Sequence, residues 1–421
     1  MMPNPVGDAA HDLEILVEVA RQMSETFELR PLLRSVEQAG RAALGSERAT
    51  IFLYDAQQDE LYSTVATGTT GEIRFSAKLG IAGEAAQTRS IVAVPDAYAD
   101  QRFNPEIDRQ TGYHTRNLFT LPLITPDGQL IGVLQVLNKK TGQFTAADER
   151  LAVALGSLAG LAIKRQMLLD EAAEKQKLER DLNIARTIQQ NLLPERNPAI
   201  QGFDIAGWNR PADQTGGDCY DFFSVRDDRL AILVADATGH GIGPALIVAQ
   251  CRSLLRALGD TSDDLGAVVG KVNNLLCEDL PSDRFVTMFF GVLDAPARRL
   301  DYVSAGHGPQ LYFRAATGEA EAFSATGLPM GIMPDAQMQL APPIRFESGD
   351  MFMVVTDGFS EWSRPDGQQY GEERLIEVVR KNRARPCVEL ISLIYQDVRR
   401  FSEGSPQMDD LTIVLIKRTE P

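Results

Sequence analysis

The stretch Val234-Ala235-Asp236-Ala237-Thr238-Gly239-His240-Gly241 decides the fold of the second half of the chain. The apolar run that leads into it, residues 230–235, predicts a buried strand, and the apolar-periodic residues from Pro244 onward predict a helix. Asp236 therefore stands where a buried strand passes into a tight glycine turn. Its carboxylate is expected to project from a rigid edge, beside backbone groups that no side chain covers.

Acids occur in a similar setting at three other places. Asp218 follows two glycines, Asp357 ends an apolar strand over 351–356, and Asp409 precedes an apolar strand over 411–416. Residues this far apart in sequence can meet only if their strands lie side by side. Carboxylates that meet repel one another, and hard divalent cations that prefer oxygen ligands, Mg²⁺ or Mn²⁺, are suited to lie between them.

Five motifs that contain these acids or lie between them follow one another along the second half of the chain. They occupy residues 216–221, 236–241, 304–309, 356–361 and 409–412. One such motif carries little weight, because Asp-Gly is a common turn. Five in this order resemble the metal-dependent PPM-type protein phosphatases, and most of all their bacterial SpoIIE/RsbU-like branch. The resemblance implies an αββα sandwich over residues 195–421.

The resemblance extends to the residues that would bind two divalent cations. It implies that Asp236 bridges both cations and that the carbonyl oxygen of Ala237 supplies one more ligand. Asp357 and Asp409 would complete the shell of the second cation, with Asp218 nearby, directly or through water. Asp236 and Asp357 are the acids on which catalysis is expected to depend most, because the cations offset the charge of a phosphate monoester and activate water for in-line attack.

The resemblance leaves some roles unassigned. Asp221 and Asp410 are expected to support the ligands rather than to bind metal. The large eukaryotic relatives hold phosphate with an arginine near their first motif, and here Arg210 is a candidate by proximity only. Those relatives also place a histidine two residues after the bridging acid, whereas His240 lies four residues after Asp236. For His240, a role in shaping the turn is therefore favoured over general acid catalysis.

Composition limits the class of protein. The chain has 421 residues, 44% of them hydrophobic, which suits two or three domains with real cores. Its formal net charge of −16 argues against a nucleic-acid partner. Its four cysteines form no Cys-x-x-Cys pair, so a zinc site or a disulfide framework is not expected. No signal-peptide pattern stands out, and we expect a cytoplasmic protein with no membrane partner.

The first half of the chain, residues 10–165, predicts an antiparallel sheet flanked by helices, a domain of the α+β class. Helices are expected from about Leu13 and over 29–44, a hairpin turn at Asp127-Gly128, and a capped helix start at Thr145. This order, together with the sequences at 80–85 and 121–123, resembles a GAF domain. The strands are expected at 48–54, 61–66, 72–76, 91–94, 117–124 and 129–138.

A signature of GAF domains that bind cyclic nucleotides recurs in Asn138-Lys139, Phe144 and Asp148-Glu149. Lys139 at a strand end is placed to pair with Asp148 on the following helix and to fix the loop between them. The pair is therefore a candidate for the ligand-binding region, and the resemblance implies a cyclic nucleotide as the ligand. The alternative is a surface ion pair worth about 0–1 kcal/mol.

A helical linker, residues 166–194, is expected between the two domains. No proline occurs from Thr145 to Leu193, so one very long helix or two in tandem are expected up to Pro194. A polar seam of this kind predicts a weak coiled coil, interpreted as a parallel homodimer, and a solvated helix without a partner is the alternative. Residues 184–194 resemble the connector helix of SpoIIE/RsbU-like phosphatases. The seam comprises Leu168, Glu171, Lys175, Leu178, Leu182, Ala185, Gln189 and Leu192.

Together these features predict a signal-regulated phosphatase that acts on phosphoserine or phosphothreonine of a protein. The resemblance suggests an anti-sigma-factor antagonist as the substrate, and a ligand of the GAF domain would control activity through the register of the linker helix. Two alternatives stay open: a catalytically inactive adaptor with a phosphatase fold, and a phosphatase of small phosphoesters. All the acids expected for two cations are present, which argues against the first alternative.

Overall fold

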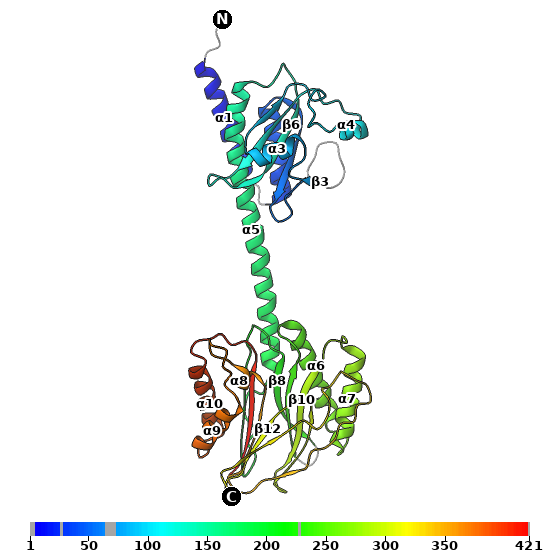
Figure 1. Ribbon diagram of the computed structural model, residues 1–421, viewed down its shortest axis with the longest axis vertical. Helices are drawn as coiled ribbons and strands as arrows, with labels where there is room; N and C mark the ends of the chain where they lie inside the picture. Colours follow the sequence, from blue (N-terminus) through cyan, green and yellow to red (C-terminus); the bar gives the residue numbers. More distant parts are fainter. Residues whose placement is uncertain (1–4, 26–27, 64–72, 226–228, 420–421) are drawn as a thin grey trace. The chain divides into compact units, whose positions relative to one another are not determined.

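A computed structural model describes residues 5–25, 28–63, 73–225 and 229–419 (Figure 1). The chain divides into two compact units, residues 1–177 and 178–421, and the division falls inside the helix α5 (Ala146–Leu192). Of the two arrangements expected for the linker, the structure has the single long helix, with 47 residues. Nearly all of the predicted linker lies within it.

The first unit is a six-stranded antiparallel sheet in the order β3-β2-β1-β6-β5-β4, covered on both faces. Helices α1, α2 and the first part of α5 pack on one face through residues such as Val36 and Leu155, and α3 packs on the other through Ala82 and Ala85. The α+β class predicted for this half is confirmed. The elements are α1 (Pro5–Ser24), α2 (Leu29–Ala43), β1 (Ser46–Asp55), β2 (Glu60–Ser63), β3 (Ile73–Ser76), α3 (Gly80–Thr88), β4 (Val92–Val94), α4 (Glu106–Thr111), β5 (Leu118–Ile124) and β6 (Leu130–Lys139).

Local signals in the first half predicted most of these elements. The amide of Thr145 donates to the Asp148 carboxylate over 2.8 Å and the amide of Asp148 donates to the Thr145 hydroxyl over 3.3 Å, which is the expected helix cap. The strand expected at 61–66 is β2 as far as Ser63, and residues 64–66, like Glu72, lie outside the described residues. The short helices α3 and α4 were not predicted, because they span too few residues to show a clear helical period.

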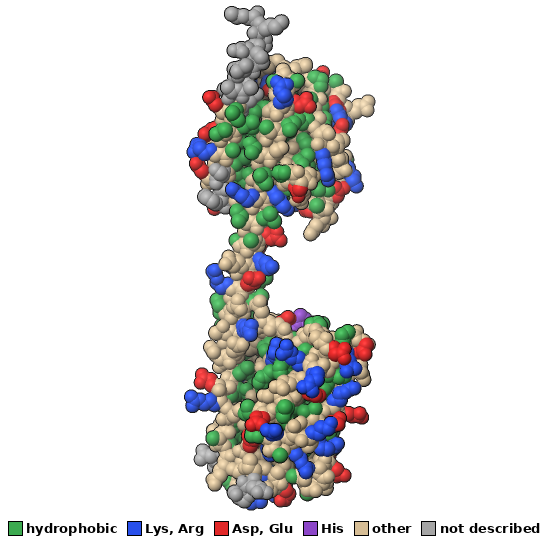
Figure 2. Space-filling view, turned by 90° about the vertical axis from the view of Figure 1, so that its left-hand side faces the viewer, with side chains coloured by type: hydrophobic (Ala, Val, Ile, Leu, Met, Phe, Trp, Pro, Cys, Tyr) green, Lys and Arg blue, Asp and Glu red, His purple; other side chains and the backbone are tan. Residues whose placement is uncertain are grey.

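Helix α5 changes its surroundings along its length. Leu155, Ala159 and Ile163 are buried in the core of the first unit. By length and composition α5 is also apolar enough to cross a membrane, which was not expected, and 44% of its most apolar window is buried in the fold. Figure 2 shows side chains of both charges along the part of α5 beyond this core, as the polar seam predicted.

The predicted seam of α5 is only partly open to a second helix. Leu168 and Leu178 are 51% and 59% exposed. Leu182 and Leu192 are half-buried, and Gln189 is buried against the second unit. The expectation that Gln189 faces a partner helix is therefore wrong: the last turns of α5 bind to this chain's own second unit.

The second unit is an αββα sandwich, as predicted. One five-stranded sheet has the order β14-β11-β10-β9-β8 and the other has the order β13-β12-β15-β16-β7. Figure 1 shows α6 and α7 outside the first sheet and α9 and α10 outside the second. The elements are β7 (Phe203–Arg210), β8 (Asp218–Val225), β9 (Arg229–Ala237), α6 (Ile242–Leu258), α7 (Leu265–Asp279), β10 (Val286–Asp294), β11 (Arg299–Ala305), β12 (Gln310–Phe313), β13 (Ala320–Phe323), β14 (Ile344–Arg345), β15 (Met351–Val355), α8 (Gly358–Glu361), α9 (Glu372–Asn382), α10 (Cys387–Phe401) and β16 (Leu411–Arg418).

The layer between the two sheets is apolar in the middle and polar at one end. Alternate residues of β9 and β16, such as Ile232, Val234, Val414 and Ile416, fill its centre. Continuing the same alternation, Asp236 and Thr412 face the same layer near its end. Strand alternation thus places the acids of the motifs at the rim of a packed core.

Candidate functional site

The acids predicted to bind metal gather at this polar end, where each sheet contributes two adjacent strands. Asp218 on β8 stands directly opposite Asp236 on β9. On the other sheet, β15 and β16 are neighbours, Asp357 directly follows β15 and Asp409 lies just before β16. Asp218 and Asp236 lie inside paired strands rather than after them, because the β8–β9 ladder extends further than the apolar runs of the sequence.

Asp236 lies among like charges. Its carboxyl forms a hydrogen bond with the carboxyl of Asp218. Burial raises the pKa of Asp236 to about 7, and the negative charges of Asp357 and Asp409 add to the effect. A carboxylate from the far sheet can raise this pKa only if it lies close by. The electrostatics of Asp236 therefore agree with an acidic cluster to which both sheets contribute.

Asp357, like Asp409, is exposed to solvent. Desolvation, the charge of Asp409 and the charge of Glu361 all raise the pKa of the Asp357 carboxyl. The Asp357 side chain is exposed, so the charges of Asp409 and Glu361 account for the larger part of this effect. Glu361, one helical turn further on in α8, thus extends the negative rim of the site.

Asp410 supports the loop that carries Asp218. Its carboxylate accepts from the amides of Ala212 over 2.7 Å and Asp218 over 3.3 Å. Burial raises the pKa of Asp410, and these backbone donors oppose the shift. A side chain at Gly216 would stand 2.4 Å from the Asp410 carboxylate. This close approach explains why the motif needs glycine there, and it matches the supporting role predicted for Asp410.

The donor set fits hard cations. Within the described ranges, no three Asp, Glu, His or Cys side chains already stand close enough together to hold a metal ion. Carboxylates are expected to stand apart when no cation lies between them, because they repel. Every side chain in the centre offers oxygen, which suits Mg²⁺ or Mn²⁺ better than a softer metal.

The turn after Asp236 is held from two sides. Ala237 donates its amide to the carbonyl of Gly217 over 3.0 Å. Arg284 donates to the carbonyl of Thr238 over 2.7 Å. His240 Nδ1 lies 2.8 Å from the Asp213 carboxylate, and both of these side chains are exposed. The contact with Asp213 supports the turn-shaping role that was favoured for His240.

Two other residues of the motifs or their surroundings have structural partners. Asp221 forms ion pairs with Arg252 and Arg256 on α6, at 2.9 and 2.8 Å, on the face of β8 opposite to Asp218. Arg210 bonds to the hydroxyl of Tyr395 and lies over its ring, so its guanidinium is engaged there. Neither residue takes part in the acidic centre.

His307 is buried beside the centre. Its Nδ1 lies 3.1 Å from the hydroxyl of Thr287, and Thr287 stands opposite Asp236 in the strand pair β9–β10. Burial lowers the pKa of His307 to about 4, so the ring is neutral at physiological pH. These contacts agree with the structural role expected for the motif at 304–309.

Gln189 joins the end of α5 to the motif loop. Its amide nitrogen donates to the carbonyl of Gly216 over 2.6 Å, and its amide oxygen accepts from the amide of Gly216 over 3.0 Å. The two bonds tie the helix to the loop that presents Asp218. Sequence reasoning missed this role, because the only local signal was a polar residue in an otherwise amphipathic helix.

In the first unit, the predicted pair Lys139 and Asp148 is formed. The Lys139 ammonium lies 2.6 Å from the Asp148 carboxylate and also donates to the carbonyl of Leu44 over 2.9 Å. Burial alone would raise the pKa of Asp148, but the bonds from Lys139 and Thr145 lower it. The two side chains are 15% and 13% exposed, so this is not the surface pair of the alternative reading.

A cavity of about 540 Å³ lies on the other face of the sheet, between β1, β6 and α3. Arg48, Thr50 and Gln135 line it from the sheet, while Phe75 and Phe103 contribute aromatic walls. Lys139 and Asp148 are not among its lining residues. Lys139 and Asp148 therefore stabilise the structure of the domain. The cavity is formed by residues that the signature does not include.

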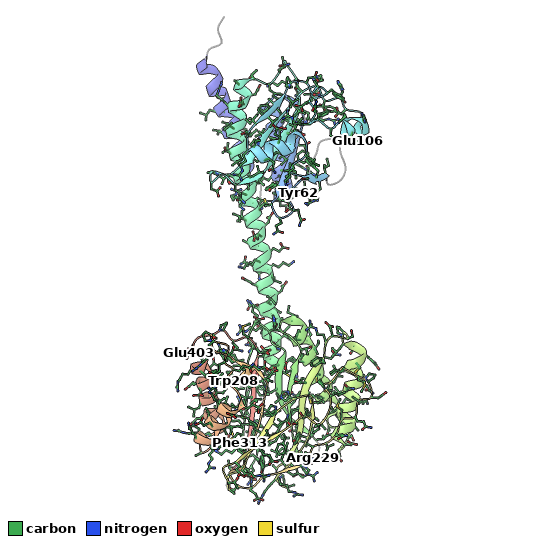
Figure 3. All side chains as sticks on the ribbon, viewed as in Figure 1. Tyr62, Glu106, Trp208, Arg229, Phe313 and Glu403 are labelled. Carbon is green, nitrogen blue, oxygen red and sulfur yellow. The ribbon has the colours of Figure 1, made fainter. Side chains whose placement is uncertain are left out.

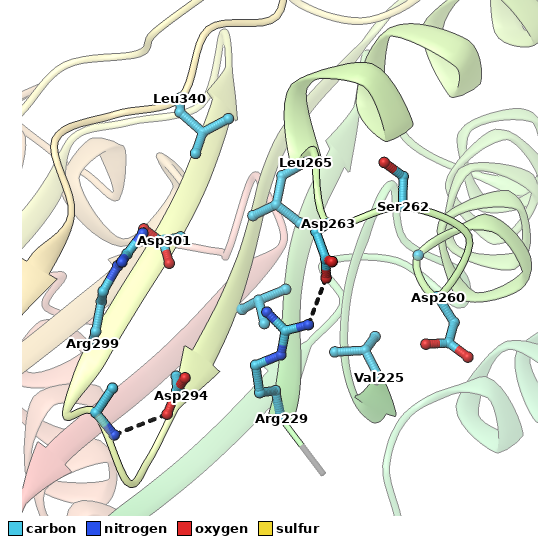
Figure 4. Close-up of a pocket in the computed structure, with 13 residues that line it drawn as sticks. Val225, Arg229, Asp260, Ser262, Asp263, Leu265, Asp294, Arg299, Asp301 and Leu340 are labelled. Carbon is cyan, nitrogen blue, oxygen red and sulfur yellow. Dashed lines mark hydrogen bonds and ion pairs between the residues drawn. The ribbon is translucent and has the colours of Figure 1, made fainter. Parts of the chain in front are cut away.

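A smaller cavity of about 270 Å³ opens at the end of the sandwich away from the acids (Figure 4). Its two arginines are engaged: Arg229 bonds to Asp263 over 2.7 Å, and Arg299 bonds to Asp301 over 2.7 Å. Figure 4 shows the Arg229–Asp263 pair, with Arg299 and Asp301 side by side, on the wall of the cavity. With its charges paired, this cavity has no part in the acidic centre.

Comparison with known proteins agrees with this geometry. Residues 226–419 match the family model described as Stage II sporulation protein E (SpoIIE), and residues 28–163 match the GAF domain model. The SiaA-PP2C domain of Pseudomonas aeruginosa, a solved structure, covers 59% of this chain and 100% of its own at a TM-score of 0.52 and 22% identity. That likeness supports the sandwich fold.

Two curated proteins are similar over more than half of the chain. Protein IcfG of Synechocystis sp. is 31% identical over 265 residues, which cover 56% of this chain and 41% of IcfG. Phosphoserine phosphatase RsbU of Bacillus subtilis is 26% identical over 251 residues, which cover 58% of this chain and 72% of RsbU. The chain thus matches less than half the length of the first of these relatives. Taken with the fold and the acidic centre, these matches show that the chain joins a GAF domain to a PP2C-type phosphatase domain of the SpoIIE family.

Proposed function

We propose that the chain is a signal-controlled, metal-dependent phosphatase that removes phosphate from serine or threonine of a protein. The observation that carries the proposal is the acidic centre, in which Asp218 and Asp236 stand opposite each other on β8 and β9, while Asp357 and Asp409 flank the neighbouring strands β15 and β16 of the other sheet. Like charges held together by strands from both sheets need cations between them. The similarity to a phosphoserine phosphatase supports the substrate class.

Asp236, Asp357 and Asp409, with the carbonyl of Ala237 and with Asp218 nearby, would hold two divalent cations, Mn²⁺ or Mg²⁺. Bound there, the cations would offset the charge of the phosphoryl group and activate water. The chain's own part is to hold the acids at fixed positions: Asp410 and Gln189 anchor the loop of Asp218, and Arg284 anchors the turn after Asp236. The resemblance suggests an anti-sigma-factor antagonist as the substrate.

The test is phosphate release from a phosphoserine protein by the full chain, with Mn²⁺ and with a chelator, compared with Asp236→Asn. We expect release that depends on metal and falls by at least about a thousandfold in the variant, since metal stabilisation of the transition state amounts to several kcal/mol. Equal release by the variant would refute the metal centre. Release from free nucleotides but not from the phosphoprotein would instead favour the small-phosphoester reading. Mn²⁺ binding without any release would favour the inactive adaptor.

We propose further that the GAF cavity binds a cyclic nucleotide. Its volume of about 540 Å³ is within the range of small-molecule sites. Arg48 and the N-terminal residues of α3 could meet the phosphate, and Phe75 and Phe103 could stack on the base. Calorimetric titration of the full chain with cyclic GMP and cyclic AMP tests this. Binding that is lost in Arg48→Ala is expected, and no binding of either nucleotide would refute it.

The contact between Gln189 and Gly216 is the proposed route of control. A ligand that favours one position of α5 would form or release the two bonds and so move the loop of Asp218. Gln189→Leu, which removes both bonds at similar volume, should change basal activity several-fold and abolish the response to ligand. Thr187→Ala, on an exposed position of the same helix, serves as the control. An unchanged ligand response in Gln189→Leu would refute this route.

The linker helix is proposed to form a parallel homodimer. Leu168 and Leu178 of the predicted seam are each more than half exposed on α5. They lie in the part of the seam that the second unit does not cover. Sedimentation equilibrium of the full chain and of Leu168→Asp tests this, with a shift from dimer to monomer expected. A monomeric wild-type chain would refute the dimer.

A further inference from the structure

A chain of polar side chains crosses the sandwich just below the acids. Asn209 on β7, Thr412 on β16 and Thr356 at the end of β15 belong to one sheet, and Asp218 on β8 belongs to the other. Asp218, Thr356 and Thr412 are 3%, 2% and 0% exposed. At this depth water cannot replace a missing partner, so each hydrogen bond has to be made within the protein.

Both threonine hydroxyls point at the same atom. Thr412 Oγ1 lies 2.7 Å from Asp218 Oδ2, and Thr356 Oγ1 lies 2.8 Å from it. A hydroxyl has one proton to donate and lone pairs with which to accept. The direction of these two bonds therefore depends on what else each hydroxyl contacts.

Two N–H groups decide the direction. Asn209 Nδ2 donates to Thr412 Oγ1 over 2.8 Å, and the amide of Thr412 donates to Thr356 Oγ1 over 2.9 Å. Each hydroxyl oxygen thus already accepts a hydrogen bond, and its own O–H is free to donate one. The one competing acceptor, the carbonyl of Thr412, lies 3.5 Å from Thr356 Oγ1 and is neutral. The shorter bond to the carboxylate is the stronger one.

We infer that Asn209, Thr356 and Thr412 are positioning residues for the metal centre. They direct two hydroxyl protons onto Oδ2 of Asp218 and leave the other carboxylate oxygen to serve the centre. We call these three residues the hydroxyl relay. The inference deepens the proposed function and rests on it.

The relay answers a specific physical problem. Asp218 is in contact with Asp236, so repulsion between the two carboxylates drives them apart whenever both are ionised. Donors from the opposite sheet hold Asp218 by one oxygen against that repulsion. Because the Asp218 side chain is already ordered before metal binds, metal binding does not carry the entropic cost of ordering it. Partners of this kind typically change metal affinity by about 10- to 100-fold.

The experiment is calorimetric titration of the full chain with Mn²⁺. Thr412→Val and Thr356→Val keep the shape of the side chain but remove the hydroxyl, and each should weaken Mn²⁺ binding by about 10- to 100-fold. Thr412→Ser and Thr356→Ser restore the hydroxyl and should bind within a few-fold of wild type. Asn209→Leu removes only the donor that orients Thr412, so a smaller loss of several-fold is expected.

Tyr312→Phe is the matched control. The hydroxyl of Tyr312 also bonds to a buried carboxylate, that of Asp350, but at the opposite end of β15. Its loss should lower the melting temperature and leave Mn²⁺ affinity unchanged. If one valine variant fails to fold, as judged by the fluorescence of Trp208 and Trp362, the other valine variant and Asn209→Leu still decide the matter.

The outcomes separate the relay from the proposed function. Valine variants that bind Mn²⁺ within twofold of wild type would overturn the relay, whatever their stability. A wild-type chain that binds Mn²⁺ but releases no phosphate would overturn the proposed function, and weaker binding by the valine variants would still support the relay. A wild-type chain that binds no Mn²⁺ would overturn both.

Discussion

The two signature clusters of this chain use charge in opposite ways. In the GAF domain, Lys139 and Asp148 meet at 2.6 Å with little exposure and complete each other. In the phosphatase domain, Asp236 gathers with Asp357 and Asp409, and burial together with their charges raises its pKa to about 7. The opposite charges of Lys139 and Asp148 neutralise each other within the chain and stabilise the fold, so we call this pair the finished cluster. The like charges around Asp236 are not neutralised within the cluster and favour the binding of a cation, so we call this group the unfinished cluster.

The comparison also explains why the GAF signature does not mark the ligand site. Its lysine and its aspartate are already bound to each other and to the backbone of Leu44 and Thr145, with no charge left for a ligand. The cavity on the other face of the sheet keeps Arg48, whose cation lies 3.8 Å from the centre of the Tyr113 ring. An unpaired charge in a cavity is the better guide to a binding site.

The largest effect should come from breaking the finished cluster. Lys139→Met leaves the nearly buried Asp148 without its partner, and the free energy of unfolding of the GAF domain should fall by about 3 kcal/mol. Urea unfolding of the full chain, followed by far-ultraviolet circular dichroism, measures this. Both tryptophans, Trp208 and Trp362, lie in the phosphatase domain, so their fluorescence reports that domain separately (Figure 3 labels Trp208).

Lys78→Met is the matched control in the same domain. Lys78 pairs with Asp59 at 3.1 Å, but its side chain is 71% exposed. Removal of this pair should cost about 0–1 kcal/mol. If Lys139→Met cost no more than this control, the contrast drawn between the two clusters would be wrong.

A smaller effect of the opposite sign is expected in the unfinished cluster. Asp236→Asn removes the negative charge that the neighbouring acids repel. The phosphatase domain without metal should therefore become more stable by on the order of 1–3 kcal/mol. The melting midpoint of the tryptophan fluorescence in chelator measures the gain. Destabilisation of the metal-free domain would show that Asp236 is not under repulsion. Added Mn²⁺ should stabilise wild type and not the variant.

A further effect in the same cluster is the response of the metal-free protein to pH. The pKa of Asp236 is about 7 in the folded chain and 3.8 in the unfolded reference, so the folded state binds the proton more tightly. This contribution to stability is present at low pH and is lost as the pH rises from about 4 to about 7. In chelator, the fluorescence midpoint should therefore fall by a few degrees over that range. The difference between the midpoints of Asp236→Asn and wild type should grow as the pH rises. A difference that does not change with pH beyond the experimental error would contradict the assignment.

Short-range patterns carried most of the fold prediction. Strand alternation, glycine turns and the cap at Thr145 need only neighbours along the chain, and the structure bears them out. The order of the motifs predicted the sandwich and the place of its acids. The prediction was wrong for Gln189, whose spacing fits a coiled-coil seam but whose side chain forms a hydrogen bond with Gly216 of the same chain.

The sequence by itself predicted the two domains, a helical linker between them and the identity of the acids at the strand ends. Only the tertiary structure decided which groups hold those acids. Asn209, Thr356 and Thr412 belong to no pattern of their own, and they meet Asp218 only because β7, β16 and β15 pair in that order opposite β8. The physical reason is that side-chain type and spacing set local structure, whereas hydrogen bonds between residues about two hundred positions apart depend on how the sheets are assembled.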